Sequence, residues 1–126
     1  MYSFNIILPY SDMSSAKKRN MSSAQLQAVA RMFSALSEPS RLALLQALHE
    51  GPLTVGELVE ASGMKQANVS KHLGVLFEHH LVQRKREGAS VRYEIADPMI
   101  FSLCDLVCRK MEKDATQTVA LFRSEA

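Results

Sequence analysis

Between residues 64 and 95 the spacing of the apolar side chains changes from three or four residues to two. In the first part, the apolar positions fall on one face of a helix of about residues 66–79 and are Val69, Leu73, Leu76 and Phe77. In the second part, apolar and charged residues alternate with the period of a strand, and residues 87–90 supply a turn that contains Gly88. The pattern therefore predicts a helix followed by a short β-hairpin.

The side of the predicted helix opposite its apolar stripe is polar and carries Gln66, Asn68, Ser70 and Lys71. Amide side chains can pair with adenine edges in the major groove, and hydroxyl and ammonium groups suit phosphates. The segment 64–95 contains six basic and three acidic residues, a net charge of +3. A polar-faced helix followed by a basic hairpin outlines a winged helix-turn-helix, although a solvated surface would use the same residue types.

Further helices are predicted on both sides of this stretch. Ser22 with Gln25 forms a capping box that starts a helix of about residues 22–36, and Pro39 suits the first turn of a second helix. Thr54 with Glu57 forms another capping box, which opens a short third helix over residues 54–61. The expected fold class is mainly α with a small β-hairpin.

The last predicted helix begins after Asp97 and Pro98 and continues to about residue 122. At about 26 residues it would be roughly 40 Å long, which is more than a small domain needs and suggests a partner subunit. Residues 1–21 show no helical period and include the basic cluster 17–19. We therefore expect a flexible N-terminal arm over residues 1–21 and one domain over residues 22–123.

The composition of the 126 residues is that of an ordinary globular protein, with 47% hydrophobic and 22% charged residues. The net charge of +2 would not by itself indicate a nucleic-acid partner, but the positive charge is concentrated in separate segments. Two cysteines cannot build a disulfide framework, and no segment resembles a signal peptide or a membrane span. These features predict a cytoplasmic protein.

Four stretches resemble the ArsR family of bacterial winged-helix repressors, namely residues 36–42, 53–63, 66–73 and the hairpin that follows Leu81 and Val82. The resemblance covers about residues 23–110 and keeps the order and spacing of every element. It implies a homodimer in which the first and last helices pair across a two-fold axis and two recognition helices enter successive major grooves. It also implies a repressor that releases DNA when a metal ion, a metalloid or a thiol-modifying signal binds.

We expect ten side chains to contact DNA. The lysine at position 65 opposes the helix dipole and forfeits a cap at a cost of about 1 kcal/mol, which a phosphate could offset. Thr54 starts the third helix, where free amides can receive a phosphate, and the hairpin cations suit the minor groove. The full set is Thr54, Lys65, Gln66, Asn68, Ser70, Lys71, Arg84, Lys85, Arg86 and Arg92.

The metal sites typical of the family are not matched in this sequence. Residues 53–58, where some members carry a cysteine motif, contain no thiol. In the last helix Asp97 matches the family's ligand pattern, but the other ligand positions hold Met99, Lys110 and Lys113. Because an ammonium group cannot ligate a divalent cation, we expect no zinc-type site and no resident cofactor.

Cys104 and Cys108 lie four residues apart and therefore on one face of the last helix. Three interpretations remain open for this pair: packing as small hydrophobes, oxidation or persulfidation, and binding of soft As(III) or Cu(I). Sulfur-responsive members of the family pair a last-helix cysteine with one in the second helix, where this sequence has Gln46. That difference weakens the redox interpretation.

The sequence therefore predicts a homodimeric, sequence-specific repressor that binds double-stranded DNA and is released by an inducer. Two alternatives remain: a winged-helix module for protein–protein interaction, and a repressor without a small-molecule sensor. We find no nucleophile–base pair, carboxylate dyad or phosphate-binding loop in the sequence, so we expect no enzymatic activity.

Overall fold

The computed structural model describes residues 19–124 and contains two compact units, one formed by Arg19–Asp97 and one that contains the last helix. Most of the predicted arm, residues 1–18, lies outside the described residues. Among the described residues, the first unit holds the shorter helices and the strands, and the second holds the longest helix.

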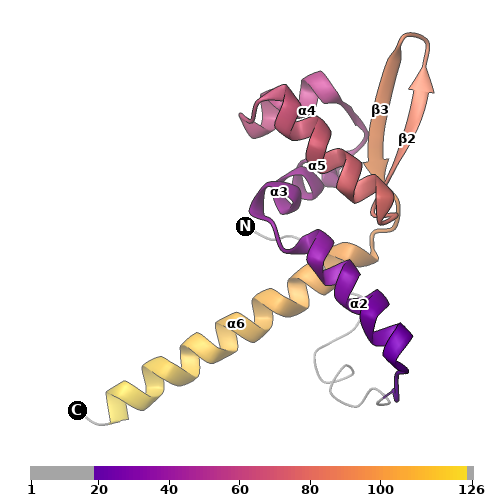
Figure 1. Ribbon diagram of the computed structural model, residues 1–126. Coiled ribbons are helices and arrows are strands. Elements are labelled where there is room, and N and C mark those ends of the chain that lie inside the picture. The colour runs from indigo at the N-terminus through magenta and orange to yellow at the C-terminus, as the bar shows by residue number, and fades with distance from the viewer. Residues whose placement is uncertain (1–18, 125–126) are drawn as a thin grey trace. The chain divides into compact units, whose positions relative to one another are not determined.

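The first unit starts with two helices (Figure 1), and a side chain caps the start of each. Helix α2 spans Ser23–Leu36, and Ser22 and Gln25 form the predicted capping box. Helix α3 spans Pro39–Ala47 with the proline in its first turn, and Glu38 caps it by accepting a hydrogen bond of 2.9 Å from the Ser40 amide. A short 3-10 helix, η1, follows over Leu48–Glu50.

Helices α4 (Val55–Ser62) and α5 (Gln66–Glu78) form the helix-turn-helix. Gly63 ends α4 in the left-handed conformation, with φ of 73°, and only Met64 and Lys65 separate it from α5. The helix predicted over residues 66–79 is therefore confirmed to within one residue.

A small antiparallel sheet completes this unit, with the strand order β1–β3–β2. Strands β2 (Val82–Glu87) and β3 (Ser90–Ile95) form the predicted hairpin, and Gly88 adopts the positive φ of 62° in its two-residue turn. Strand β1 (Leu53–Thr54) pairs with β3 and was not predicted from the sequence. Two residues are too short to show the alternation of a strand.

The core of the first unit is mainly aliphatic. Its least exposed side chains come from α3, η1, α4 and α5 and are Leu44, Leu48, Leu58, Val69, Leu73 and Leu76. The apolar pattern placed Phe77 with them, but 37% of its surface remains exposed. The phenyl ring lies at the edge of the buried stripe of α5, where a hairpin side chain covers it.

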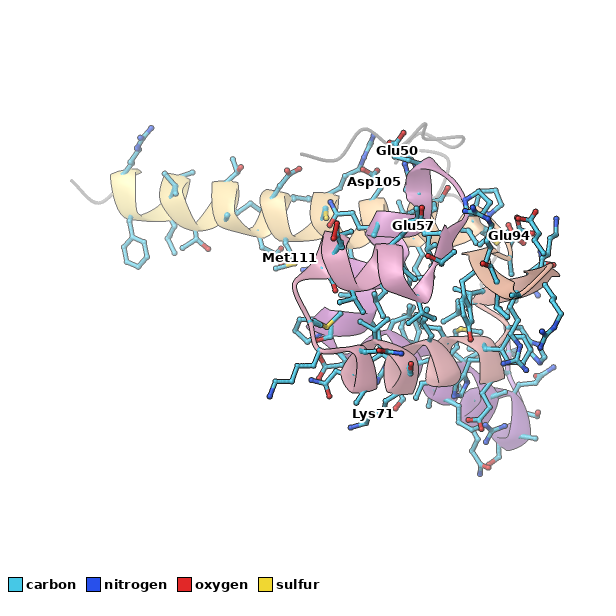
Figure 2. All side chains as sticks on the ribbon, turned by 90° about the horizontal axis from the view of Figure 1, so that it is seen from above. Glu50, Glu57, Lys71, Glu94, Asp105 and Met111 are labelled. Carbon is cyan, nitrogen blue, oxygen red and sulfur yellow. The ribbon has the colours of Figure 1, made fainter. Side chains whose placement is uncertain are left out.

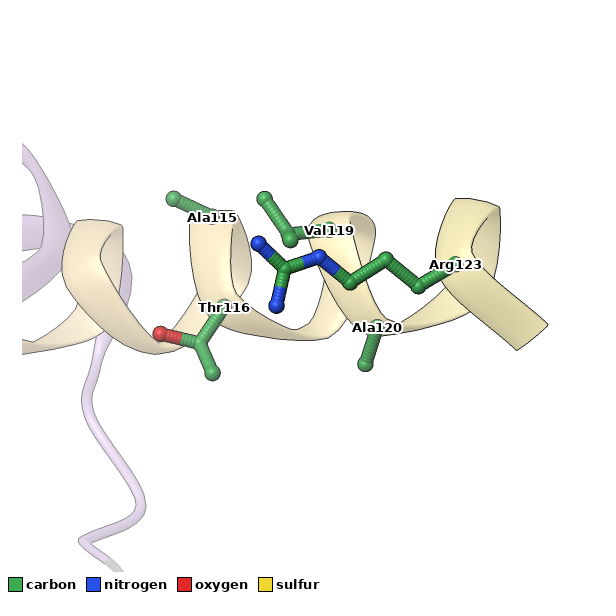
Figure 3. A pocket seen from close by; sticks show the side chains of 5 residues that line it. All are labelled: Ala115, Thr116, Val119, Ala120 and Arg123. Carbon is green, nitrogen blue, oxygen red and sulfur yellow. The ribbon is translucent and has the colours of Figure 1, made fainter. Parts of the chain in front are cut away.

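The second unit contains helix α6, which spans the 26 residues Met99–Ser124. Ion pairs with i to i+4 spacing join Asp105 to Arg109 at 2.8 Å and Lys110 to Asp114. Figure 3 shows that Ala115, Thr116, Val119 and Ala120 line a pocket on the C-terminal half of α6 together with Arg123. Within residues 19–124, no helix is long and apolar enough to cross a membrane.

Candidate nucleic-acid interface

Helix α5 separates a buried face from a polar face. Val69 and Leu73 are fully buried on the side that faces the core, and both belong to the predicted apolar stripe. Four of the predicted DNA contacts are exposed along the rest of the helix: Gln66, Asn68, Ser70 and Lys71. Figure 2 shows Lys71 projecting outward from α5. The packing of the buried face holds these polar groups on a rigid helix, as a recognition element requires.

Lys65 precedes this polar face as the N-cap residue of α5. Its backbone is extended, and its side chain makes no capping hydrogen bond. The exposed ammonium group therefore stands beside the start of the helix, next to Gln66. Because helix amides also point outward at an N-terminus, an anion can be held there by both kinds of donor.

Thr54 has a structural task that limits its use as a phosphate ligand. Its hydroxyl accepts a hydrogen bond of 3.1 Å from the Glu57 amide, and the Glu57 carboxylate accepts one of 2.8 Å from the Thr54 amide. The backbone hydrogen bond to Thr54 is the main reason why the pKa of Glu57 is lowered. The negative carboxylate already occupies the start of α4, which weakens the attraction of that helix terminus for a phosphate.

The four cations of the hairpin lie on two different faces. Arg84, Lys85 and Arg86 are consecutive in β2, and Lys85 lies opposite Arg92 of β3. Side chains alternate between the faces of a strand and are shared between directly opposed residues. Lys85 and Arg92 therefore lie on one face, and Arg84 and Arg86 lie on the other.

Acidic side chains neutralise the face that carries Lys85 and Arg92, and Figure 2 labels two of them, Glu57 and Glu94. The Lys85 ammonium is 3.2 Å from the Glu94 carboxylate. Arg92 Nε lies 2.9 Å from Glu87 Oε1, and its Nη1 lies 3.4 Å from Glu57 Oε1. These ion pairs offset the repulsion between the two opposed cations, and they leave little free positive charge on this face.

The opposite face of the hairpin is turned toward α5. The Arg84 guanidinium lies over the Phe77 ring, 4.0 Å from its centroid, in a cation–π contact that joins the hairpin to α5. Arg86 is exposed, and no residue of the described chain forms a hydrogen bond or ion pair with it. The free positive charge of the hairpin is therefore on the same face as the contact with α5.

Sequence reasoning assigned no role to Arg41, which contacts the recognition helix. Its guanidinium Nη1 lies 3.1 Å from Nδ1 of His72, 31 residues away along the chain. No local pattern in the sequence indicates a contact over this separation.

Cys104 and Cys108 occupy successive turns of α6, and both are half-buried. The pKa of Cys104 is raised, chiefly by burial and additionally by the neighbouring Cys108. Within the described residues, no group of three or more His, Cys, Asp or Glu side chains could hold a metal ion. Among the residues that the structure describes, an ion at this position would therefore have only these two thiols as cysteine, histidine or carboxylate ligands.

Comparisons with known proteins agree with this architecture. A family model described as a helix-turn-helix domain matches residues 36–84. The regulator NmtR of Mycobacterium tuberculosis is 42% identical over 92 residues, which cover 69% of this chain and 77% of NmtR. A probable mercury resistance operon repressor of Streptomyces lividans is 42% identical over 74 residues, and the chain spans 59% of its length.

Solved structures extend the similarity to the whole winged domain. The homodimeric winged helix-turn-helix DNA-binding domain Mb0332 of Mycobacterium bovis has a TM-score of 0.66 and 30% identity, covering 79% of this chain and 94% of that one. The antimony-specific transcriptional repressor AntR has a TM-score of 0.67 and 31% identity, covering 82% of this chain and 94% of that one. Matching helices, hairpin and sequence lead to one conclusion: the chain belongs to the ArsR family of winged helix-turn-helix transcriptional repressors, and not to a family of enzymes.

Proposed function

We propose that this protein is a homodimeric repressor that binds double-stranded DNA with α5 and the β2–β3 hairpin and is released by an inducer. The observation that carries this proposal is the exposed polar face of α5, which is rigidly backed by Val69, Leu73 and Leu76. We assign the DNA-binding and dimerisation domain to residues 22–123. We also propose that the protein acts in the cytoplasm, because the regulators that it resembles are bacterial proteins.

Exposed apolar residues on α2 and α6 support the homodimer. On α2, Leu26 and Phe33 are each 52% exposed, and on α6, Met111 and Phe122 are 65% and 70% exposed. Such residues on helices that flank a DNA-binding core suit an interface between two copies. Mb0332, whose fold is similar, is a homodimer.

We assign different tasks to the polar residues of α5. Gln66 and Asn68 carry amides, which can pair bidentately with an adenine edge and so read sequence. Ser70, Lys71 and the preceding Lys65 suit phosphate oxygens, which position the helix without reading bases. Loss of an amide should therefore change sequence preference, whereas loss of an ammonium group should weaken binding to every duplex.

Fluorescence anisotropy with the DNA upstream of the protein's own gene tests these assignments. Gln66→Ala should lose about 30-fold or more in affinity for this DNA and much less for a scrambled duplex, because a bidentate base contact contributes about 1–3 kcal/mol of discrimination and a dimer makes two such contacts. The matched control is Gln46→Ala, which removes an exposed amide from α3. Equal losses on both duplexes would contradict base reading by Gln66.

The salt dependence of binding separates this function from protein–protein interaction. A repressor that neutralises several phosphates per dimer loses affinity steeply as salt concentration rises. A winged helix that docks on another protein would bind duplex DNA weakly and without this slope. A flat salt dependence would therefore favour the interaction module.

For the inducer we propose a soft metal or metalloid ion that binds Cys104 and Cys108. Their Cβ atoms lie about 5–6 Å apart at this helical spacing. A disulfide needs about 3.5–4.5 Å, so oxidation to a bridge would distort α6, whereas one soft ion can join both sulfurs. The relatives named for mercury resistance and antimony specificity support this class of inducer.

The experiment adds As(III), Cu(I), Zn(II), polysulfide or peroxide to the preformed DNA complex. We expect a soft ion to release DNA from the wild type and not from Cys104→Ser or Cys108→Ser. The double variant Cys104→Ala with Cys108→Ala is the control for packing. Alanine keeps the apolar character of both positions and removes both sulfur ligands. Unchanged release in all these variants would leave the cysteines a packing role only.

A further inference from the structure

One arginine side chain joins the end of α2 to the middle of the recognition helix. Arg41, in the first turn of α3, donates from Nε to the carbonyl oxygen of Ala35 at 2.6 Å and from Nη2 to that of Ser34 at 3.2 Å. Its remaining terminal nitrogen, Nη1, lies 3.1 Å from Nδ1 of His72 in α5. The planar guanidinium thus binds two carbonyls from the last turn of α2 and one imidazole at the same time.

This contact defines which nitrogen of the His72 ring accepts a hydrogen bond. An arginine guanidinium has only donors, so Nδ1 of His72 must accept the hydrogen bond. A neutral imidazole that accepts at one nitrogen carries its proton on the other, which here is Nε2.

The surrounding residues make the link a rigid one. Ala35 and Leu36 at the end of α2 are 2% and 9% exposed, so the carbonyl anchors of Arg41 belong to a packed segment. His72 is half-buried on α5, between the exposed Lys71 and the buried Leu73. The imidazole therefore stands at the border between the core and the polar face of the recognition helix.

We propose that Arg41 and His72 are positioning residues for DNA recognition, and that their hydrogen bond holds α5 in a defined place relative to the C-terminal end of α2. The link transmits a displacement of α2 to the base-reading face of α5, because the guanidinium is hydrogen-bonded both to α2 carbonyl oxygens and to His72 of α5. This inference rests on the proposed function, in which α5 reads DNA and α2 contributes to the dimer. It assigns an allosteric connection to two side chains that need not touch DNA.

The test compares variants that preserve either the cation at position 41 or the ring at position 72. Arg41→Lys keeps the cation and removes the fork of donors, and His72→Phe keeps the ring and removes the acceptor. His72→Asn retains an acceptor oxygen close to the place of Nδ1 and serves as the rescue variant. Arg31→Lys, at an exposed position of α2, is the matched control for the arginine replacement.

Operator affinity and affinity for a scrambled duplex are measured for each variant. Arg41→Lys and His72→Phe should lose about tenfold on the upstream DNA, within the usual range of coupling between sites, and less than about twofold on the scrambled duplex. His72→Asn and Arg31→Lys should stay close to the wild type. Parallel losses on both duplexes, or equal effects of His72→Asn and His72→Phe, would overturn the proposal.

Nitrogen-15 NMR of the free protein gives a readout that does not depend on DNA. The wild type should show His72 with a protonated Nε2 and an unprotonated Nδ1, and Arg41→Lys should shift the tautomer equilibrium toward Nδ1–H. An unaltered tautomer in Arg41→Lys would overturn the link even if DNA binding is lost. Absence of salt-dependent binding in the wild type, with the tautomer as expected, would instead reject the proposed function.

Discussion

The two faces of the β2–β3 hairpin differ in charge, because one carries a cation without an ion pair and the other carries cations that form ion pairs. The salt dependence of DNA binding can measure this difference. Arg86 is exposed and makes no ion pair within the described chain, whereas Lys85 lies 3.2 Å from Glu94 on the opposite face. Arg86→Ala should therefore remove a phosphate contact from each protomer. The double variant Lys85→Ala with Glu94→Ala removes a pair whose net charge is zero.

The expected magnitude comes from counterion release. Each phosphate that a protein neutralises on duplex DNA contributes about −0.9 to the slope of log K against log salt concentration. A dimer loses two contacts in Arg86→Ala, so the slope should become less steep by about 1.8. If the wild type and Arg86→Ala bind equally at about 1 M salt, this change of slope makes the affinity of the variant about 30-fold weaker at roughly 0.15 M salt.

Anisotropy titrations at several salt concentrations, on the upstream DNA and on a scrambled duplex, measure these slopes. Arg86→Ala should weaken binding to both duplexes by the same factor, because phosphates are common to all sequences. The double variant should change the slope by less than about a third of this amount. A larger slope change in the double variant than in Arg86→Ala would refute the division of the hairpin into a free and a neutralised face.

Three further predictions concern stability. Leu73→Ala should lower the free energy of unfolding by about 3 kcal/mol in urea, since this leucine is fully buried, and a loss below about 1 kcal/mol would contradict its place in the core. Thr54→Ala should cost about 1 kcal/mol through loss of the α4 cap, with Thr54→Ser close to the wild type. The pKa values of Glu38 and Glu57 are lowered from 4.5, chiefly by backbone hydrogen bonds at helix starts. The stability that these two carboxylates add is therefore present above pH 4.5 and is lost as the pH falls through their folded-state pKa values. The Tm of the double variant Glu38→Gln with Glu57→Gln should therefore fall less than that of the wild type between about pH 5 and pH 3. Parallel curves of Tm against pH for the two proteins would contradict these pKa shifts.

The sequence alone was sufficient for the helices, the hairpin and the family. The capping boxes at Ser22 and Thr54 were recognisable because their partners lie three residues away, and the structure confirms both. The apolar period of α5 and the glycine in the hairpin turn are local in the same way. The polar residues of α5 could be selected as candidates because helical geometry alone places them off the apolar stripe.

Contacts between distant segments were decided only by the tertiary structure. Arg92 meets Glu57 across 35 residues, and Arg41 meets His72 across 31, so no periodicity or capping motif connects either pair. The sequence counted Arg92 as a DNA-facing cation, whereas packing places it between two carboxylates. Hydrogen bonds within a turn of helix depend on neighbouring residues, but the electrostatic surroundings of a side chain depend on which elements pack against it. For this reason the sequence determined that a helix with a polar face would precede a basic hairpin, and the fold determined which cations of the hairpin form ion pairs.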